Sequence, residues 1–324
     1  MNVTLPGRGM ALVMVLLLLA VMASVCTGLS YRISRQTDRM RSLQDYQQAT
    51  WYAVSAESLA LSILNENLKN EEYNPVYLWG AGPHLFPLSQ GKITVTLRDA
   101  QACFNLNALA QPTTVSRPFA GQQLIALISR LDVPVQRAAQ ITESLQAFTG
   151  GGRDGQTQRA QQESEYLTRP VPFWPANQLL TDISEIRVVQ GMDAALYQKI
   201  KPLVCALPMN RQRININTLD VSQSVILEAL FGPGVSSVQA RALLQQRPGK
   251  GWRNVGQFLA SPYLKQVDEN VRKQVGEFLT VSSHYFWLRS DIIVNETELT
   301  MNSLIARTGL QHFSVLWHQT GESE

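Results

Sequence analysis

The chain has 324 residues, of which 45% are hydrophobic and 16% charged, and its formal net charge is +3. This length allows one or two domains with a sizeable core, and so small a charge does not by itself indicate a nucleic-acid partner. The sequence also lacks the His-Glu-x-x-His and Gly-x-Ser-x-Gly patterns of two hydrolase classes. We therefore expect a protein that is not an enzyme and requires no cofactor.

The first feature in chain order is a long uncharged run. No charged side chain occurs from Met10 to Tyr31. A hydrocarbon core about 30 Å thick requires about 20 helical residues, so residues 10–31 predict a membrane-spanning helix. A cleaved signal peptide, with an apolar region of about 7–15 residues, is the alternative. We expect the membrane-facing residues to include Met10, Ala11, Leu12, Met14, Leu16, Leu17, Leu18 and Leu19.

The residues before this run carry a recognisable pattern. Gly7-Arg8-Gly9-Met10 resembles the class III signal of pilin-like proteins, which prepilin peptidase cleaves after the glycine. The resemblance implies a leader at residues 1–9, cleavage between Gly9 and Met10, and methylation of the Met10 amine. It also implies that the helix stays in the product, anchored in the inner membrane with the body in the periplasm.

Two details modify this expectation. Pilin-like chains usually carry Glu at the fifth mature position, where this sequence has Met14. That lack suits a subunit at the end of a fibre, and it is known for minor pseudopilin K of type II secretion systems. Four arginines follow the apolar run, against Arg8 before it, so the positive-inside rule favours the opposite orientation; we discount the rule because long domains translocate regardless of charge.

The helix is predicted to continue well beyond the membrane. Residues 32–69 contain no Pro or Gly, and apolar residues recur at alternating steps of three and four. This is one narrow helical stripe, formed by Tyr46, Ala49, Ala53, Ala56, Ala60 and Ile63. We expect one helix from Met10 to about Asn70, half in the membrane and half packed on a body; a free coiled coil is the alternative. Turns are expected at Asn74-Pro75 and at residues 80–83.

Strand patterns flank the middle of the chain. Residues 92–99 alternate apolar and polar side chains, which predicts a half-buried strand. A second strand is predicted at residues 285–294. A third strand is expected to carry Leu299, Met301 and Ile305 on one face, and a fourth strand Phe313, Val315 and Trp317 on one face. The pattern predicts an α+β fold, in which a long N-terminal helix packs on an antiparallel sheet. Residues 32–103 contain the second half of the helix and the first part of this domain, residues 282–324 complete its sheet, and residues 104–281 are inserted.

The insertion is predicted to be all-helical. Apolar residues at helical spacing indicate helices at residues 121–131, 135–148, 183–192, 193–203, 222–231, 236–246 and 267–278. Asp193, Asp220, Ser222 and Ser236 are candidate N-caps.

Three cysteines are present, and Cys26 lies in the apolar run. Cys103 and Cys205 are then free to pair in a periplasmic body, and two buried thiols are the equally open alternative.

Two short segments repeat each other at the start of the insertion and within it. Phe104-Asn105-Leu106-Asn107 and Ile214-Asn215-Ile216-Asn217-Thr218 both alternate apolar residues with asparagine. Together with the N-terminal signal, the missing Glu and Ser184-Glu185-Ile186-Arg187, they make nearly the whole chain resemble the general secretion pathway protein K family. The resemblance implies a tip complex with minor pseudopilins I and J on a fibre of major pseudopilin, which supports export of folded proteins across the outer membrane.

A membrane-anchored DNA receptor is the alternative function. Residues 214–259 resemble tandem helix-hairpin-helix (SAM-like) sequences, with Gly232-Pro233-Gly234 as a hairpin. Backbone N–H groups of such hairpins contact phosphate with help from basic residues, here Arg241, Arg247, Lys250 and Arg253. Because Asp220 and Glu228 oppose them, we expect a scaffold without nucleic acid.

A calcium site is the last candidate. The type II family binds calcium in an acidic stretch after the helix at residues 141–148, but this chain has Thr149-Gly150-Gly151-Gly152-Arg153-Asp154-Gly155 there. Calcium requires 6–8 oxygen ligands. Asp154, Glu163 and Glu165 are weak candidates, and solvated loop charges are the simpler interpretation.

Overall fold

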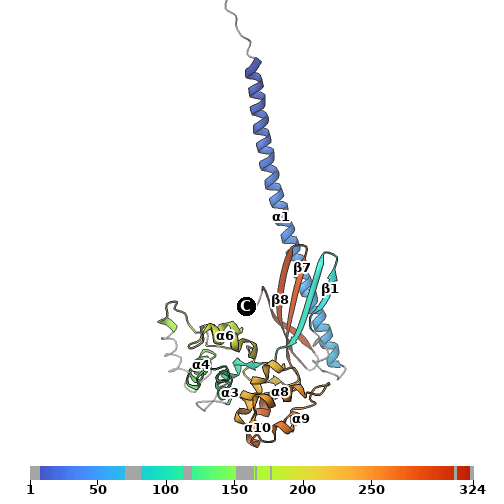
Figure 1. The fold of residues 1–324 in the computed structure, drawn as a ribbon. Coiled ribbons are helices and arrows are strands. Elements are labelled where there is room, and N and C mark those ends of the chain that lie inside the picture. The colour runs from blue at the N-terminus through green and yellow to red at the C-terminus, as the bar shows by residue number, and fades with distance from the viewer. Residues whose placement is uncertain are drawn as a thin grey trace, which may run out of the picture.

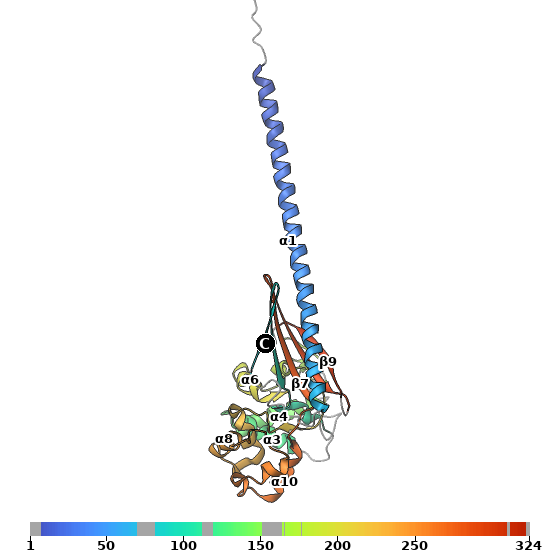
Figure 2. The same ribbon diagram turned by 90° about the vertical axis from the view of Figure 1, so that its right-hand side faces the viewer.

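A single long helix dominates the computed structural model, which describes residues 8–69, 82–111, 119–150, 164, 166–175, 177–309 and 312–321. Helix α1 (Arg8–Lys69) has 62 residues, which corresponds to about 90 Å. Its first half projects beyond the rest of the molecule as a straight rod (Figures 1 and 2). The prediction of one continuous helix is confirmed; the turn expected at Asn74-Pro75 lies outside the described residues.

The sheet is antiparallel and five-stranded, in the order β1-β2-β7-β8-β9. The strands are β1 (His84–Leu88), β2 (Gly91–Asp99), β7 (Tyr285–Val294), β8 (Thr297–Arg307) and β9 (Phe313–Thr320). Four strands were expected, so β1 corrects the prediction. It escapes the pattern because it is a largely exposed edge strand that contains Pro87, and edge strands tolerate proline and need no alternation.

Strands from the two ends of the chain lie side by side. β2 pairs with β7 along its whole length, from Gly91 opposite Val294 to Asp99 opposite Phe286. The chain therefore leaves the sheet at the end of β2 and returns to it at the start of β7, and the intervening region lies beyond that end of the sheet (Figure 1).

The second half of α1 packs on one face of this sheet. Ala49, Ala53, Ala56 and Ala60 are buried, and Leu64 completes the stripe. They share a core with Val95, Leu288 and Met301 of three strands. Small side chains on the helix allow the helix and sheet to approach closely, and the coiled-coil alternative for this half is wrong.

A β-bulge corrects one predicted face of β9. Val315 pairs with Ile305, but Trp317 pairs with Leu304, so Leu316 is an extra residue at a register shift. One inserted residue reverses the alternation. Val315 consequently packs toward α1, whereas Trp317 lies on the other face against Trp287, with ring centroids 5.3 Å apart.

The intervening region is mostly helical and close to prediction. Its α-helices are α3 (Phe119–Ser129), α4 (Val135–Phe148), α6 (Ala194–Ile200), α7 (Ser224–Phe231), α8 (Ser237–Gln245), α9 (Val255–Leu259) and α10 (Glu269–Phe278). Its 3-10 turns are η1 (Leu106–Ala110), η2 (Ile183–Val188), η3 (Lys201–Leu203), η4 (Val221–Gln223), η5 (Gly232–Gly234) and η6 (Pro262–Leu264).

Several local predictions need correction. The segment predicted as a helix over residues 183–192 forms only the turn η2, and α9 is too short to show a helical period. Asp193, Asp220 and Ser236 do cap α6, η4 and α8. Ser222 is not a cap, because its backbone N–H instead donates to the Asp220 carboxylate.

The region is also not all-helical, because it contains two short pairs of parallel strands. β3 (Phe104–Asn105) pairs with β4 (Val204–Cys205), and β5 (Ile214–Asn215) pairs with β6 (Leu279–Thr280). Each pair joins the beginning of one unit to its end. The region thus consists of two successive units, at residues 104–205 and 214–280, each closed by a strand pair.

The repeated asparagine segments make equivalent hydrogen bonds in the two units. In each, the first asparagine accepts a hydrogen bond from the backbone N–H of the second, Asn107 in one unit and Asn217 in the other. Asn107 then exchanges hydrogen bonds with the backbone of Leu180. Asn217 makes the equivalent pair with Trp252. The sequence echo therefore marks a structural repeat, in which one buried amide fixes a distant loop.

Candidate functional site

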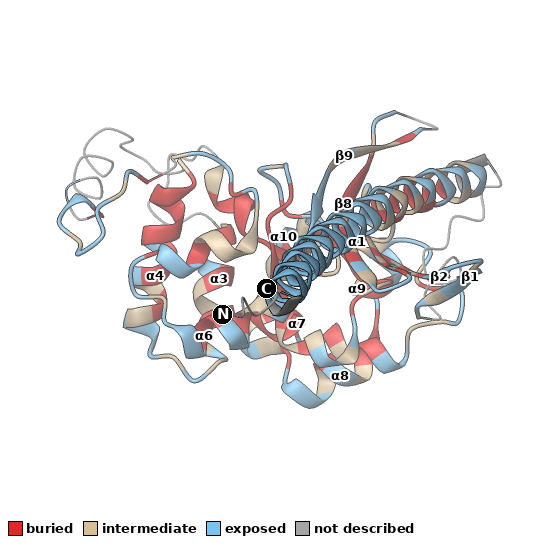
Figure 3. Cartoon of the chain, turned by 90° about the horizontal axis from the view of Figure 1, so that it is seen from above, coloured by how far each residue is buried: buried red, intermediate tan, exposed pale blue. Residues whose placement is uncertain are grey.

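The first candidate surface is the projecting part of α1. Met10, Leu12 and Met14 are 71%, 64% and 65% exposed, and the exposure continues around the helix (Figure 3). All of the residues expected to face the membrane lie on this exposed stretch, including Ala11, Leu16, Leu17, Leu18 and Leu19. Among the described residues, α1 is the one helix long and apolar enough to cross a membrane. So much apolar surface requires a lipid or protein environment.

The predicted processing site lies at the start of this helix. α1 begins at Arg8, so Gly9 and Met10 belong to its first turn. The residues before Arg8 lie outside the described part of the chain. Met14 is one turn further along, and its apolar side chain is exposed.

Asp99 organises the junction between the sheet and the helical region. Its carboxylate, at the end of β2, accepts hydrogen bonds from Ser283 Oγ, Thr218 Oγ1 at 2.6 Å and Asn215 Nδ2 at 2.7 Å. The Gln101 backbone N–H donates a fourth at 2.7 Å. Burial raises the pKa of Asp99 above its usual value, and these donors oppose the rise. One side chain therefore joins β2, the second unit and the segment that returns to β7.

A disulfide closes the first unit beside this junction. The structure joins Cys103 and Cys205, with their Cα atoms 5.9 Å apart. The bond lies in a small core with Ala100, Leu207 and Leu304, so it fastens the first unit to the end of β2 and to the sheet. Cys26, on the exposed part of α1, is a free thiol.

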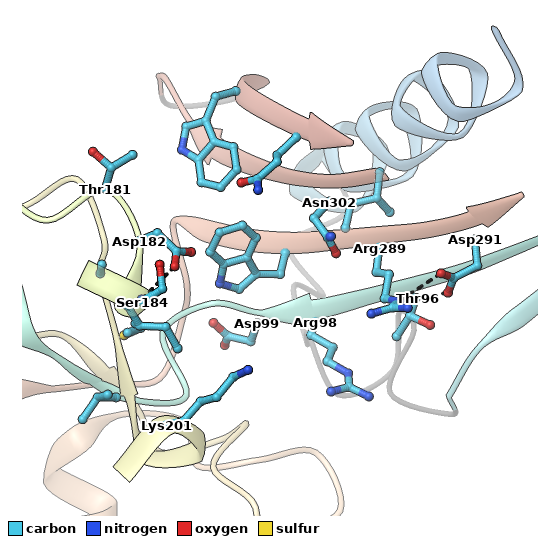
Figure 4. Close-up of a pocket in the computed structure, with 18 of the residues that line it drawn as sticks. Thr96, Arg98, Asp99, Thr181, Asp182, Ser184, Lys201, Arg289, Asp291 and Asn302 are labelled. Carbon is cyan, nitrogen blue, oxygen red and sulfur yellow. Dashed lines mark hydrogen bonds and ion pairs between the residues drawn. The ribbon is translucent and has the colours of Figure 1, made fainter. Parts of the chain in front are cut away.

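A groove of about 930 Å³ lies between the first unit and the sheet face opposite α1. Figure 4 shows Asn302, Arg289 and Thr96 extending from the sheet, and Asp182, Ser184 and Lys201 on the facing segments. Asp182 caps η2, and Arg289 pairs with Asp291 at 3.0 Å. The described residues that line the groove form a broad surface of mixed polar and apolar side chains.

The structure gives a different role to one residue of the DNA-binding alternative. The Arg247 guanidinium is half-buried and donates to the backbone carbonyls of Asn217 and Leu219. Gly234, in the expected hairpin, lies against Val267. These contacts hold the second unit together, and they engage the Arg247 guanidinium within that unit.

Metal ligands do not gather in the described part of the chain, where no group of three His, Cys, Asp or Glu residues could hold an ion. The calcium candidates Asp154, Glu163 and Glu165 all lie outside the described residues.

Sequence reasoning missed Asp99, Glu57 and the tryptophan pair of the groove. Glu57 is buried among the alanines of α1. Its position beside the alanine stripe could have indicated a buried carboxylate. Its hydrogen-bond partners could not be predicted, because they lie on β8 and β9, about 250 residues away. The predicted face of Trp317 was wrong because a β-bulge cannot be recognised from the alternation of apolar and polar residues.

A long apolar N-terminal helix on an antiparallel sheet defines a pilin-like protein. In this chain a mostly helical region separates β2 from β7, which are neighbouring strands of the sheet. Family models described as type II secretion system protein K match residues 102–209 and 214–281, which correspond to the two units. The chain belongs to the type II secretion system protein K family, so it is a pseudopilin, a structural and non-enzymatic component of protein secretion.

Relatives match the chain over almost its full length. Type II secretion system protein K of Klebsiella pneumoniae is 34% identical over 320 residues, covering 97% of this chain and 96% of the relative. The protein from Pectobacterium carotovorum is 33% identical over 321 residues, with coverage of 97% and 96%. GspK in the crystal structure of the GspK–GspI–GspJ complex from enterotoxigenic Escherichia coli is 67% identical, with a TM-score of 0.80, and the match covers 88% of this chain and 100% of that one.

Proposed function

We propose that this chain caps the tip of a type II secretion pseudopilus in a complex with minor pseudopilins I and J. The observation that carries the proposal is the 67% identity to a protein K crystallised with proteins I and J. The capped fibre of major pseudopilin supports export of folded proteins across the outer membrane.

The N-terminal helix fits this role. In the proposal α1 spans the inner membrane until assembly and the body lies in the periplasm. Leaving the bilayer exposes the apolar residues from Met10 onward, and packing against other pseudopilin helices would cover them again. A carboxylate in hydrocarbon is costly unless paired. A tip subunit has no further subunit above it to pair with, and Met14 avoids that cost.

Processing is a separate part of the proposal. Prepilin peptidase cleaves between Gly9 and Met10, and the new Met10 amine is methylated. The test is intact-mass measurement of the chain expressed with and without the peptidase. We expect loss of nine residues and addition of one methyl group only with the enzyme. An unclipped Met1 in both samples would reject processing, and a chain that begins beyond Leu29 would identify a cleaved signal peptide.

Residues 104–281 form a separate inserted domain in this proposal, with residues 10–31 in the membrane and residues 32–103 and 282–324 building the pilin-like part. The support is that one core joins both units of the intervening region, while a second joins α1 to the sheet.

The assembly test uses co-expression with proteins I and J of the same secretion system. With an affinity tag on protein J, we expect this chain to elute with I and J as one complex in size-exclusion chromatography. Major pseudopilin with the same affinity tag, in place of I and J, is the control and should leave the chain in a separate peak. Elution apart from I and J would reject the tip assignment. Salt-sensitive gel shifts with DNA would instead favour the receptor alternative.

A further inference from the structure

Beyond its apolar part, α1 carries three arginines on one side. Arg32, Arg35 and Arg39 are spaced by three and four residues, which aligns them along the helix. All three are exposed, and among the described residues no ion pair joins them to an acidic side chain. We call these three residues the arginine face.

The arginine face begins where the uncharged helix ends. Met10 to Tyr31 spans about 33 Å of helix, close to the hydrocarbon thickness of about 30 Å. When Met10 lies at one membrane surface, Arg32 therefore lies at the other, among the lipid headgroups. Tyr31, which is 63% exposed, belongs to the aromatic residues that favour this boundary.

The side chains also lean toward the membrane. Helical side chains tilt toward the N-terminus, which here is the membrane side. Arg35 shows this tilt directly, because its guanidinium lies 5.7 Å from the ring centroid of Tyr31, one turn earlier. The long side chains of Arg35 and Arg39 can therefore reach back to the phosphate level.

The side of α1 on which the arginine face lies favours lipid over a neighbouring helix as its binding partner. Arg35 and Ala53 are about five whole turns apart, so they lie on the same side of α1, and Ala53 is buried against the sheet. Trp51 lies about 160° around the axis from Arg35 and is 72% exposed. The open side of α1, where another helix can pack along its length, is thus the Trp51 side. Arg39 and Arg32 lie about 120° and 100° around the axis from Trp51, so the centre of the arginine face lies off that side.

We propose that the arginine face binds the phosphates of anionic phospholipids at the membrane surface reached by the end of the apolar helix. Guanidinium groups bind phosphate oxygens in a bidentate manner, and each basic residue near an anionic surface increases binding about fivefold. The site rests on the proposal that α1 spans a bilayer. It holds α1 at one depth, and these contacts must break when the subunit moves into the fibre.

The test uses the full chain in vesicles of phosphatidylcholine with a minority of phosphatidylglycerol. After mild detergent extraction, native mass spectrometry measures the ratio of the two lipids that remain bound. We expect the ratio of phosphatidylglycerol to phosphatidylcholine among the bound lipids to exceed the bulk ratio at least about fivefold, less so in high salt. A triple variant, Arg32→Gln, Arg35→Gln and Arg39→Gln, should return the ratio to the bulk value, and the matching Arg→Lys variant should retain most of the enrichment.

Arg41→Gln is the matched control, because Arg41 lies on another side of α1 and pairs with Asp38 at 4.0 Å; it should retain the enrichment. No enrichment in the unmodified chain, persistence in the triple Gln variant, or an equal loss in Arg41→Gln would each overturn the proposal. Flotation with pure phosphatidylcholine vesicles separates the two claims. A chain that floats without lipid preference refutes only the lipid site, whereas a chain that does not float refutes the membrane span.

Discussion

Ser303 on β8 donates a 2.6 Å hydrogen bond to the buried carboxylate of Glu57 on α1. Nδ1 of His318 on β9 lies 3.1 Å from the same oxygen. The long helix is therefore joined to the last two strands by this polar cluster, and Asn65 of α1 adds a second contact by accepting a 2.8 Å hydrogen bond from the backbone N–H of Phe313 on β9. Within a largely apolar interface, these contacts help to fix the register of the helix on the sheet.

Glu57→Ala is expected to destabilise the body by about 1–3 kcal/mol, because Ser303 Oγ would remain buried without an acceptor. Glu57→Gln keeps an acceptor and should cost less. The measurement is urea unfolding of the full chain in detergent, followed by tryptophan fluorescence. Glu66→Ala, at an exposed position of the same helix, is the control and should change the unfolding free energy by less than about 0.5 kcal/mol. Equal effects at the two positions would contradict this account.

The disulfide should contribute strongly to stability. Cys103 and Cys205 are 102 residues apart, and the chain-entropy model gives about 4–5 kcal/mol for closing a loop of that size. Cys103→Ser with Cys205→Ser should lower the urea midpoint accordingly, and reduction of the unmodified chain should lower it similarly. Cys26→Ser, which removes a thiol outside this bond, should have no effect. Free thiols at both positions in non-reducing mass spectrometry would refute the pairing.

Sequence patterns predicted the elements whose period is regular and long. The alanine stripe predicted the packed half of α1, and the alternation in β2, β7 and β8 predicted the sheet, because burial on one face imposes those periods. What the sequence concealed depends on partners far apart along the chain. The Asp99 network joins residues 99, 215, 218 and 283. No local sequence pattern predicts that these residues contact one another.

The Asp99 network should make stability depend on pH. Because the pKa of Asp99 is raised in the folded chain, the folded state binds more protons than the unfolded state between the two pKa values. This contribution to stability is therefore present below the usual aspartate pKa of 3.8 and is lost as pH rises through the folded pKa. We expect the unfolding free energy of the unmodified chain, relative to Asp99→Asn, to fall as pH rises across this window. Urea midpoints at a series of pH values test this, and a difference that rises or stays flat would contradict it.

Gly251 should be among the positions least tolerant of a side chain. Its φ is +73°, and a Cβ atom there would lie 2.8 Å from Cγ of Asn217, the side chain that holds the backbone of Trp252. Gly251→Ala combines left-handed backbone strain with displacement of a buried amide, so we expect a loss of about 2–4 kcal/mol.

Gly249 supplies the matched control for that change. It lies two residues earlier, and a Cβ atom there would meet nothing within 4 Å. Gly249→Ala should change stability by no more than about 0.5 kcal/mol. Asn217→Ala removes the same backbone contacts without backbone strain and should cost about 1–3 kcal/mol, while Gly251→Ala with Asn217→Ala should cost less than the sum because both remove one network. Additive losses would show that Gly251→Ala destabilises the chain through backbone strain alone, and that displacement of the Asn217 amide does not contribute.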